Sequence, residues 1–340
     1  MADVITVRGL FETHLTVSDL ERSVAFYRDV VHLPVALEVP ARSAAFFWIG
    51  EPGDSMLGLW SLGSAPLALL IAKIVLSAGF VLLGTAAAER LGPRLGGLFA
   101  ATPQMAVISL IFFAIEQGPA FAAQSSFWNI AGMCSTIPVL LAYLVATKVV
   151  AAPRTASIMA GVALGAASFA LAASLYAQIP LTHATVVLLA ATVCGVTSWM
   201  VRGLPETAEL RRVPTSGWLL AARAAVSALA VVAVTSLAHL LGPKWSGLIV
   251  AFPVNTLPVI VILHWHYGSD VIQPFIKRFP SGVFGVVLFN VVAFLCLERL
   301  GLALAVPLAY GINIAYVVLV ARLSRPRPSE RTLPAPVAGG

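Results

Sequence analysis

The chain has 340 residues, of which 59% are hydrophobic and only 11% are charged, and its mean hydropathy is +0.93. Soluble domains carry about 25% charged residues, so this composition excludes an ordinary soluble globular protein. The formal net charge of +6 does not indicate nucleic-acid binding, because the Lys and Arg residues after position 64 lie beside long apolar runs and not on one basic face. Eight of the fifteen acidic residues precede position 65, which divides the chain into two unlike parts.

Residues 1–64 have the short-period pattern of a small α+β module. Polar and apolar residues alternate from Glu12 to Val17, which is typical of a strand, and Ser18 or Asp19 can cap a helix that runs to about Val31. The apolar face of this helix consists of Leu20, Val24, Tyr27 and Val31. Three further strands are predicted at about 35–39, 44–49 and 56–60, which gives the order β-α-β-β-β.

From residue 66 onward the chain consists of apolar runs of about 20 residues, the length that crosses a ~30 Å hydrocarbon layer. We expect about nine transmembrane spans, at approximately 66–88, 96–116, 127–147, 156–177, 182–201, 217–238, 246–266, 281–297 and 301–321. The predicted fold is therefore an α-helical polytopic membrane protein in a lipid bilayer, with a small N-terminal β-α-β-β-β module. The three cysteines, Cys134, Cys194 and Cys296, lie in apolar runs and indicate no disulfide framework.

The distribution of basic residues predicts the orientation of these spans. Thirteen Lys and Arg residues fall in the connections on one side, whereas Lys244 and Arg299 are the two in the connections on the other side. By the positive-inside rule, the richer side and the C-terminus face the cytoplasm of a bacterial-type cytoplasmic (inner) membrane. With nine spans, the N-terminal module then lies outside the cytoplasm, although the first 20 residues do not have the pattern of a cleavable signal peptide.

The membrane part contains an internal repeat. A shift of 150 residues aligns Leu91-Gly92-Pro93-Arg94 with Leu241-Gly242-Pro243-Lys244. The same shift pairs Gly97 with Gly247, Pro103 with Pro253, Gly118 with Gly268, Gly132 with Gly282 and Gly161 with Gly311. Because the shift spans five helices, an odd number, the two units enter the membrane from opposite sides, which predicts a 4+1+4 inverted repeat of the kind that many transporters use.

The repeat divides the membrane part into segments. The first repeat and its linking helix occupy 65–202, a cytoplasmic loop follows at 203–216, and the second repeat occupies 217–321. The tail at 322–340 is rich in Arg and Pro, cannot bury apolar area, and is expected to be disordered.

Residues at equivalent positions of the repeat are candidates for a transport pathway. Lys73 and Arg223 are intramembrane cations that either snorkel to the interface or face an internal cavity that attracts an anion. Pro103 and Pro253 interrupt their helices, with a kink for packing as the alternative reading. Candidate pathway or ligand residues are Lys73, Arg223, Pro103, Pro253, Gln104, Asn255, Glu116 and His266, the last two either carrying protons or simply being solvated at the interface.

Other polar residues in the apolar runs are assigned structural roles. In the string His264-Trp265-His266-Tyr267 the two imidazoles point about 200° apart on a helix, so an aromatic interfacial belt is predicted and a metal site is not. Interhelical hydrogen bonds are expected for the amides within the apolar runs, with cavity lining as the alternative; these are Gln104, Asn129, Asn255, Asn290 and Asn313.

The N-terminal module resembles one half of a known type of metal site. The run from Glu12 to Asp29, followed by Leu33-Pro34 and by Phe46-Phe47-Trp48-Ile49-Gly50, resembles the vicinal oxygen chelate superfamily of glyoxalases, bleomycin-resistance proteins and dioxygenases over residues 8–62. The resemblance implies two paired β-α-β-β-β modules with a divalent metal held between them by His and Glu, and His14 matches the first-module ligand. Only one module is present and the strand at Leu57–Trp60 carries no carboxylate, so a second chain in a homodimer would have to complete the site.

The membrane part more faintly resembles the four-span GlpM-like integral membrane proteins, here duplicated, on the evidence of residues 91–98 and their copy from Leu241. This resemblance implies a fold type and no substrate. We therefore expect a transporter of a small or anionic solute with an accessory or vestigial N-terminal module. The alternatives are a membrane-tethered metal-dependent glyoxalase or dioxygenase, or a bleomycin-resistance-type binding protein, completed by dimerisation, and a helical scaffold for a lipid-processing complex.

Overall fold

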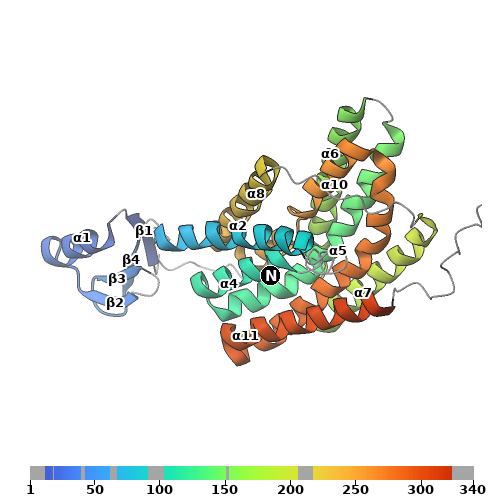
Figure 1. The fold of residues 1–340 in the computed structure, drawn as a ribbon. Coiled ribbons are helices and arrows are strands. Elements are labelled where there is room, and N and C mark those ends of the chain that lie inside the picture. The colour runs from blue at the N-terminus through green and yellow to red at the C-terminus, as the bar shows by residue number, and fades with distance from the viewer. Residues whose placement is uncertain are drawn as a thin grey trace, which may run out of the picture. The chain divides into compact units, whose positions relative to one another are not determined.

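The computed structural model describes residues 12–17, 19–39, 43–61, 67–90, 103–150, 153–205 and 217–323 (Figure 1). The chain divides into two compact units, Met1–Ala72 and Lys73–Gly340. The first unit contains a small sheet and the second consists of helices. The repeated block at 91–98 and most of the predicted tail lie outside the described residues.

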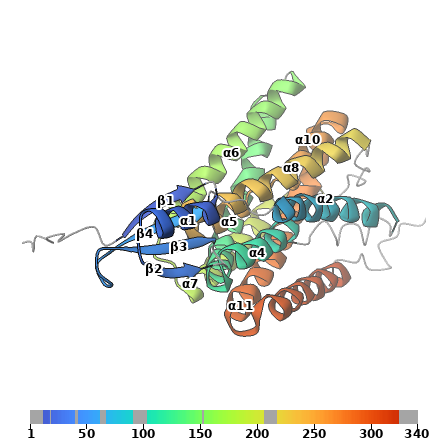
Figure 2. The ribbon, with the colours of Figure 1, turned by 90° about the vertical axis from the view of Figure 1, so that its left-hand side faces the viewer.

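The first unit has the predicted order of elements. These are β1 (Glu12–Val17), α1 (Leu20–Ala25), a π-helical turn (Phe26–Val30), β2 (Val35–Val39), β3 (Ala44–Ile49) and β4 (Ser55–Ser61). The strand order in the sheet is β1-β4-β3-β2, with β1 parallel to β4 and the other neighbours antiparallel. Helix α1 packs against this sheet (Figure 2), and the prediction of a β-α-β-β-β module is confirmed.

The short-range signals in this unit are correct except at one position. Asp19 caps α1, because its Oδ1 atom accepts a hydrogen bond of 3.0 Å from the backbone N–H of Arg22. Three residues of the predicted apolar face, Leu20, Val24 and Tyr27, pack on the buried sheet residues. Val31 is 43% exposed, however. The helix widens to a π turn at Phe26–Val30, and the extra residue in that turn rotates Val31 away from the shared face.

The second unit is a bundle of apolar helices. They are α2 (Leu67–Arg90, which contains the boundary between the units), α4 (Gln104–Glu116), α5 (Pro119–Val149), α6 (Arg154–Gln178), α7 (His183–Met200), α8 (Gly217–Ser236), α9 (Ala238–Val250), α10 (Thr256–Tyr267) and α11 (Ile272–Leu323), with short 3-10 turns at Val201–Gly203 and Ser269–Val271. Among the described residues, five helices are long and apolar enough to cross a membrane, namely α5, α6, α7, α8 and α11. Several long apolar helices are therefore present, while nine spans stay a prediction.

A proline interrupts one of the predicted spans, and a glycine marks a change of direction in a helix that covers two others. The span predicted at 246–266 is interrupted at Pro253, as the sequence predicts, because α9 ends at Val250 and α10 begins at Thr256, with Pro253 in the turn between them. Helix α11 covers the last two predicted spans and changes direction at Gly301, whose φ of 70° is in the left-handed region that favours glycine. The phenolic O–H of Tyr316 in its second half donates a hydrogen bond of 3.1 Å to the carbonyl oxygen of Ser281 in its first half.

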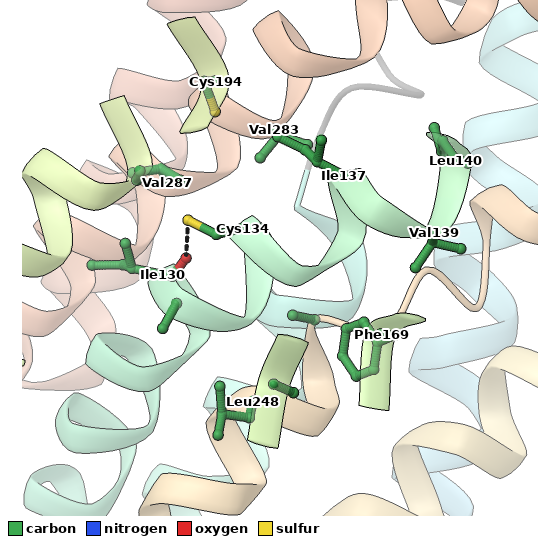
Figure 3. Close-up of a cluster of buried hydrophobic side chains, with 14 of the residues drawn as sticks. Ile130, Cys134, Ile137, Val139, Leu140, Phe169, Cys194, Leu248, Val283 and Val287 are labelled. Atoms are coloured by element: carbon green, nitrogen blue, oxygen red, sulfur yellow. Dashed lines mark hydrogen bonds between the residues drawn. The ribbon is translucent and has the colours of Figure 1, made fainter. Parts of the chain in front are cut away.

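Helix α5 is the centre of the bundle. Buried side chains such as Cys134 and Ile137 pack against residues from four other helices, as Figure 3 shows. The contacting residues include Phe169 of α6, Cys194 of α7, Leu248 of α9, and Val283 and Val287 of α11. Helix α9 crosses α5 at backbone contact, because a Cβ atom on Gly247 would overlap the carbonyl oxygen of Ser125. Small residues at such crossings allow close approach of membrane helices.

Candidate functional site

Two of the candidate residues form a buried ion pair. Lys73 lies in the second turn of α2, its side chain is 1% exposed, and its Nζ atom is 2.7 Å from Oε1 and 3.0 Å from Oε2 of Glu116 at the end of α4. The ammonium group also lies 5.6 Å from the centroid of the Phe112 ring. Lys73 therefore does not snorkel away from the protein. The sequence selects these two residues separately, and the structure brings them together.

This ion pair connects α2 to α4 inside the helical unit. An unpaired charge at this degree of burial would be strongly destabilising, and Glu116 and the aromatic ring of Phe112 compensate the ammonium charge. The hydroxyl of Ser77, one turn further along α2, donates a hydrogen bond of 2.6 Å to the carbonyl oxygen of Lys73.

The equivalent cation of the second half has different surroundings. Arg223 occupies the same place in α8 that Lys73 occupies in α2, because the two helices begin at Gly217 and Leu67. The Ser227 Oγ atom lies 2.9 Å from the carbonyl oxygen of Arg223 and also within hydrogen-bond distance of Asn255 Oδ1. In the described part of the chain, the buried Nε atom of Arg223 has no hydrogen-bond partner.

The two candidate prolines both stand at the start of a helix. Pro103 precedes α4 and its carbonyl oxygen accepts a hydrogen bond of 2.8 Å from the N–H of Val107. Pro253 precedes α10, and its carbonyl oxygen accepts a bond of 2.9 Å from Leu257. Pro103 is the residue before α4, and Pro253 lies in the turn after α9, where its ring cannot continue the helical hydrogen bonding.

The remaining candidates lie at helix ends. Gln104 is the first residue of α4, and Asn255 is the residue immediately before α10. His266 is exposed near the end of α10 and contacts the ring of Tyr267. No ion pair or hydrogen bond joins His266 to Arg223 in the described residues, so this pair does not reproduce the contact between Glu116 and Lys73.

His264, one of the residues of the predicted aromatic belt, is buried inside the helical unit. Its side chain is 4% exposed, and its Nδ1 atom lies 3.0 Å from the phenolic oxygen of Tyr143 on α5. Beside it, Nη1 of Arg154 donates a hydrogen bond of 2.7 Å to the carbonyl oxygen of Trp265. The sequence contains a signal for this burial. Positions 264 and 266 point in nearly opposite directions on a helix, so one of them faces the interior.

The polar amides in the bundle have mixed outcomes. Asn290 of α11 donates a hydrogen bond of 3.4 Å from Nδ2 to Oδ1 of Asn129 on α5, which confirms the prediction of an interhelical bond for these two residues. Asn313 is fully buried, yet neither of its side-chain amide atoms has a hydrogen-bond partner in the described part of the chain. The prediction of an interhelical hydrogen bond is therefore wrong for Asn313. Its side chain packs close to Gly285, which lies in the first half of the same helix, α11.

The proposed metal ligand of the first unit lies on an aromatic surface. His14 is exposed on β1, opposite Gly58 of β4, and its ring contacts Trp60 and Phe46 at centroid distances of 5.5 Å and 6.2 Å. Within the described ranges, no three His, Cys, Asp or Glu side chains lie close enough together to hold a metal ion. A metal site at His14 stays a prediction that depends on ligands from a second chain.

Comparisons with protein-family models, with curated proteins and with solved structures find no match for this chain. The two resemblances seen in the sequence therefore stay predictions. The function has to be inferred from the charged and polar residues of the helical unit.

Proposed function

We propose that this chain is a multi-pass membrane transporter of a small anionic solute, built as a 4+1+4 inverted repeat of about nine spans. The observation that carries the proposal is the buried ion pair between Lys73 and Glu116. Charges within membrane helices are costly, and apolar side chains of similar size would hold two helices together at least as well. Charges that persist in such a place mark a pathway for a charged solute or proton.

Equivalent backbone features support the inverted repeat. Helices α4 and α10 end at Glu116 and Tyr267, and each is followed by a glycine in the left-handed region, Gly118 with a φ of 95° and Gly268 with a φ of 88°. The serine one turn after each cation, Ser77 or Ser227, bonds to that cation's carbonyl oxygen. These features recur at a constant separation of 150 residues.

The difference between the two halves suggests how access to the pathway alternates. In the orientation expected from the basic residues, Lys73 and Glu116 lie near the outer face, and Arg223 and His266 lie near the cytoplasmic face. The outer pair is closed, and among the residues that the structure describes the inner cation has no carboxylate partner. A solute that enters from the cytoplasm would bind Arg223 first, and its release outside requires the outer ion pair to open.

One contact supports the order of the nine predicted spans, because it places two helix ends on the same side. The hydrogen bond from Arg154 to the carbonyl oxygen of Trp265 joins the start of α6 to the end of α10. Nine spans require both of these helix ends to be at the cytoplasmic face. Reporter fusions after residue 64, after residue 205 and at the C-terminus test this orientation. A cytoplasmic reporter at residue 64 would contradict the nine spans and the inverted relation of the halves.

Transport is tested with the purified full-length chain in proteoliposomes. Efflux of chloride, nitrate, acetate and phosphate is measured, and we expect at least one of them to move faster than in protein-free vesicles. Arg223→Gln should lower that flux by about tenfold or more, because a charge-assisted hydrogen bond to the solute is lost. Arg299→Gln changes an exposed cation outside the pathway and serves as the matched control. Equal flux in both variants, or no flux for any anion, would refute the proposal.

A further inference from the structure

A small cavity lies where α4, α5, α9 and α11 meet, and its polar lining is formed by neutral residues. The polar lining residues are Ser109, Ser125, Ser126, Asn129 and Asn290. Its volume is about 10 Å³, which is room for the centre of one water-sized sphere. The rest of the wall is formed by apolar residues and by Gly247, which brings the backbone of α9 close to α5.

Three hydroxyl groups in this cavity have no hydrogen-bond partner in the described part of the chain. Ser109 is 1% exposed, and Ser125 and Ser126 are each 2% exposed. Other buried hydroxyls of the bundle donate to a carbonyl oxygen one turn earlier, as Ser135 does to Ala131. The hydroxyls of the cavity do not make this bond. Buried polar groups are normally satisfied, so the missing partner is a ligand that fills the cavity.

The number of hydroxyl hydrogens that need an acceptor indicates the chemistry of that ligand. Each hydroxyl has one hydrogen to donate, whereas Nδ2 of Asn290 already donates to Oδ1 of Asn129 and to the carbonyl oxygen of Val286. A cation would bind the oxygen lone pairs and leave the three hydroxyl hydrogens without an acceptor. One water oxygen has two lone pairs and cannot accept from all three hydroxyls. A small anion can accept every one of these bonds.

The helix ends around the cavity favour negative charge. Gly242 has a φ of 68°, so α9 restarts at Pro243, and the positive N-terminal end of the restarted helix, which attracts anions, lies about one turn before Ser246 and Gly247. The Ser246 hydroxyl is also buried without a hydrogen-bond partner in the described residues. Ser109 and Glu116 are two turns apart on α4, about 10 Å, which connects the cavity to the Lys73 ion pair.

We propose that this cavity binds one dehydrated monovalent anion of halide size through the hydroxyls of Ser109, Ser125 and Ser126. The proposal rests on the transport function proposed above, and it narrows the solute class to halides.

The first test uses the full-length protein purified in detergent. Thermal unfolding is followed while sodium gluconate is replaced by sodium fluoride or sodium chloride at constant ionic strength. We expect a saturable rise in Tm with the halide, because a ligand of the folded state stabilises it, and no rise with gluconate, which is too large to enter. Choline chloride should act like sodium chloride. A rise that follows sodium whatever the anion, or no halide effect at all, would overturn the proposal, the second leaving water as the occupant.

The second test locates the binding. Ser126→Ala and Ser109→Ala should each weaken the halide affinity by about tenfold or more, since each removes one hydrogen bond to a charged ligand. Ser135→Ala, on the same helix as Ser126, removes a buried hydroxyl outside the cavity and should leave the affinity unchanged. Equal loss in all three variants would refute the assignment of the site.

The two proposals fail in different ways. Halide-dependent stabilisation that is lost in Ser126→Ala, without any flux in proteoliposomes, would keep the binding site and refute transport. Flux of another anion without halide stabilisation would refute the halide site and keep transport.

Discussion

Positions of the helical unit that are 150 residues apart match in sequence but differ in their contacts. Lys73 is paired with Glu116, whereas in the part of the chain that the structure describes Arg223 has no carboxylate partner and His266, at the position equivalent to Glu116, is exposed. The comparison shows that a match in sequence does not impose the same contacts on both halves. The transport function proposed above requires such an asymmetry, because a pathway must be closed on one side while it is open on the other.

The glycines of the repeat show the same asymmetry in packing. A Cβ atom on Gly132 would lie 2.7 Å from Cβ of Ala251, whereas one on Gly282 would meet nothing within 4 Å. Likewise Gly161 lies against the ring of Tyr143, and Gly311 faces open space. Gly132 and Gly161 therefore serve helix packing around α5, and their second-half equivalents Gly282 and Gly311 do not.

The largest expected effect comes from breaking the ion pair. Glu116→Gln should lower the free energy of unfolding by about 3–5 kcal/mol, because Lys73 is left as an uncompensated buried charge. His266→Gln, at the equivalent exposed position, should change it by less than about 0.5 kcal/mol. Denaturant-induced unfolding in detergent measures both. The double variant Lys73→Met and Glu116→Met should recover most of the loss, and equal stability of the two single variants would remove the distinction between the halves.

A second comparison is between Gly132, which is packed against other residues, and Gly282, which has open space around it. Gly132→Ala should destabilise the protein by about 1–3 kcal/mol, because the added methyl group overlaps Ala251 and the backbone of Leu248. Gly282→Ala should cause no loss and up to about 1 kcal/mol of gain, since alanine is the better helix former and has room. Thermal unfolding of both variants under the same conditions measures the change in Tm of each and checks this prediction. A larger loss for Gly282→Ala would mean that the second half is packed more tightly than described here.

The smallest effects on the free energy of unfolding are expected at Ser77 and Ser227, the serines one turn after the two cations. Ser227→Ala should cost about 1 kcal/mol, because Asn255 loses its interhelical partner. Ser77→Ala removes a bond to its own helix and should cost only a few tenths of that value. The measurement is the denaturant midpoint at constant slope. Identical midpoints for the two variants would indicate that the bond between α8 and the segment before α10 contributes nothing.

Local patterns predicted the parts of the fold that depend on near neighbours. The strands and helix of the first unit follow from alternation and capping within a few residues, so their bounds agree closely with the structure. The 150-residue repeat selected Lys73, Arg223 and the two helix-starting prolines without any knowledge of packing. The break at Pro253 was predicted from the proline itself and not from hydropathy, which measures apolar content and does not detect a broken backbone inside one apolar run.

The contacts of the candidate site were not predictable in the same way. Lys73 and Glu116 are 43 residues apart and meet only because α2 packs beside α4. Ser109, Ser125 and Ser126 do not stand out in the sequence, because serine is common in membrane helices and its hydroxyl usually bonds to the backbone of its own helix. His264 was missed because its neighbours are typical of an interface, while its burial depends on Tyr143 of another helix.

The interruption between α9 and α10 has a consequence for the kinetics of the backbone. Around Pro253 the helical ladder is replaced by tighter turn bonds, such as those from Phe252 N–H to Ile249 and from Val254 N–H to Phe252. Amide hydrogens exchange with solvent deuterium most slowly where the surrounding ladder must open as a unit, and faster where one bond can open alone. This short segment should therefore take up deuterium well before the flanking helices, as an early-labelled peptide in the middle of an otherwise protected span.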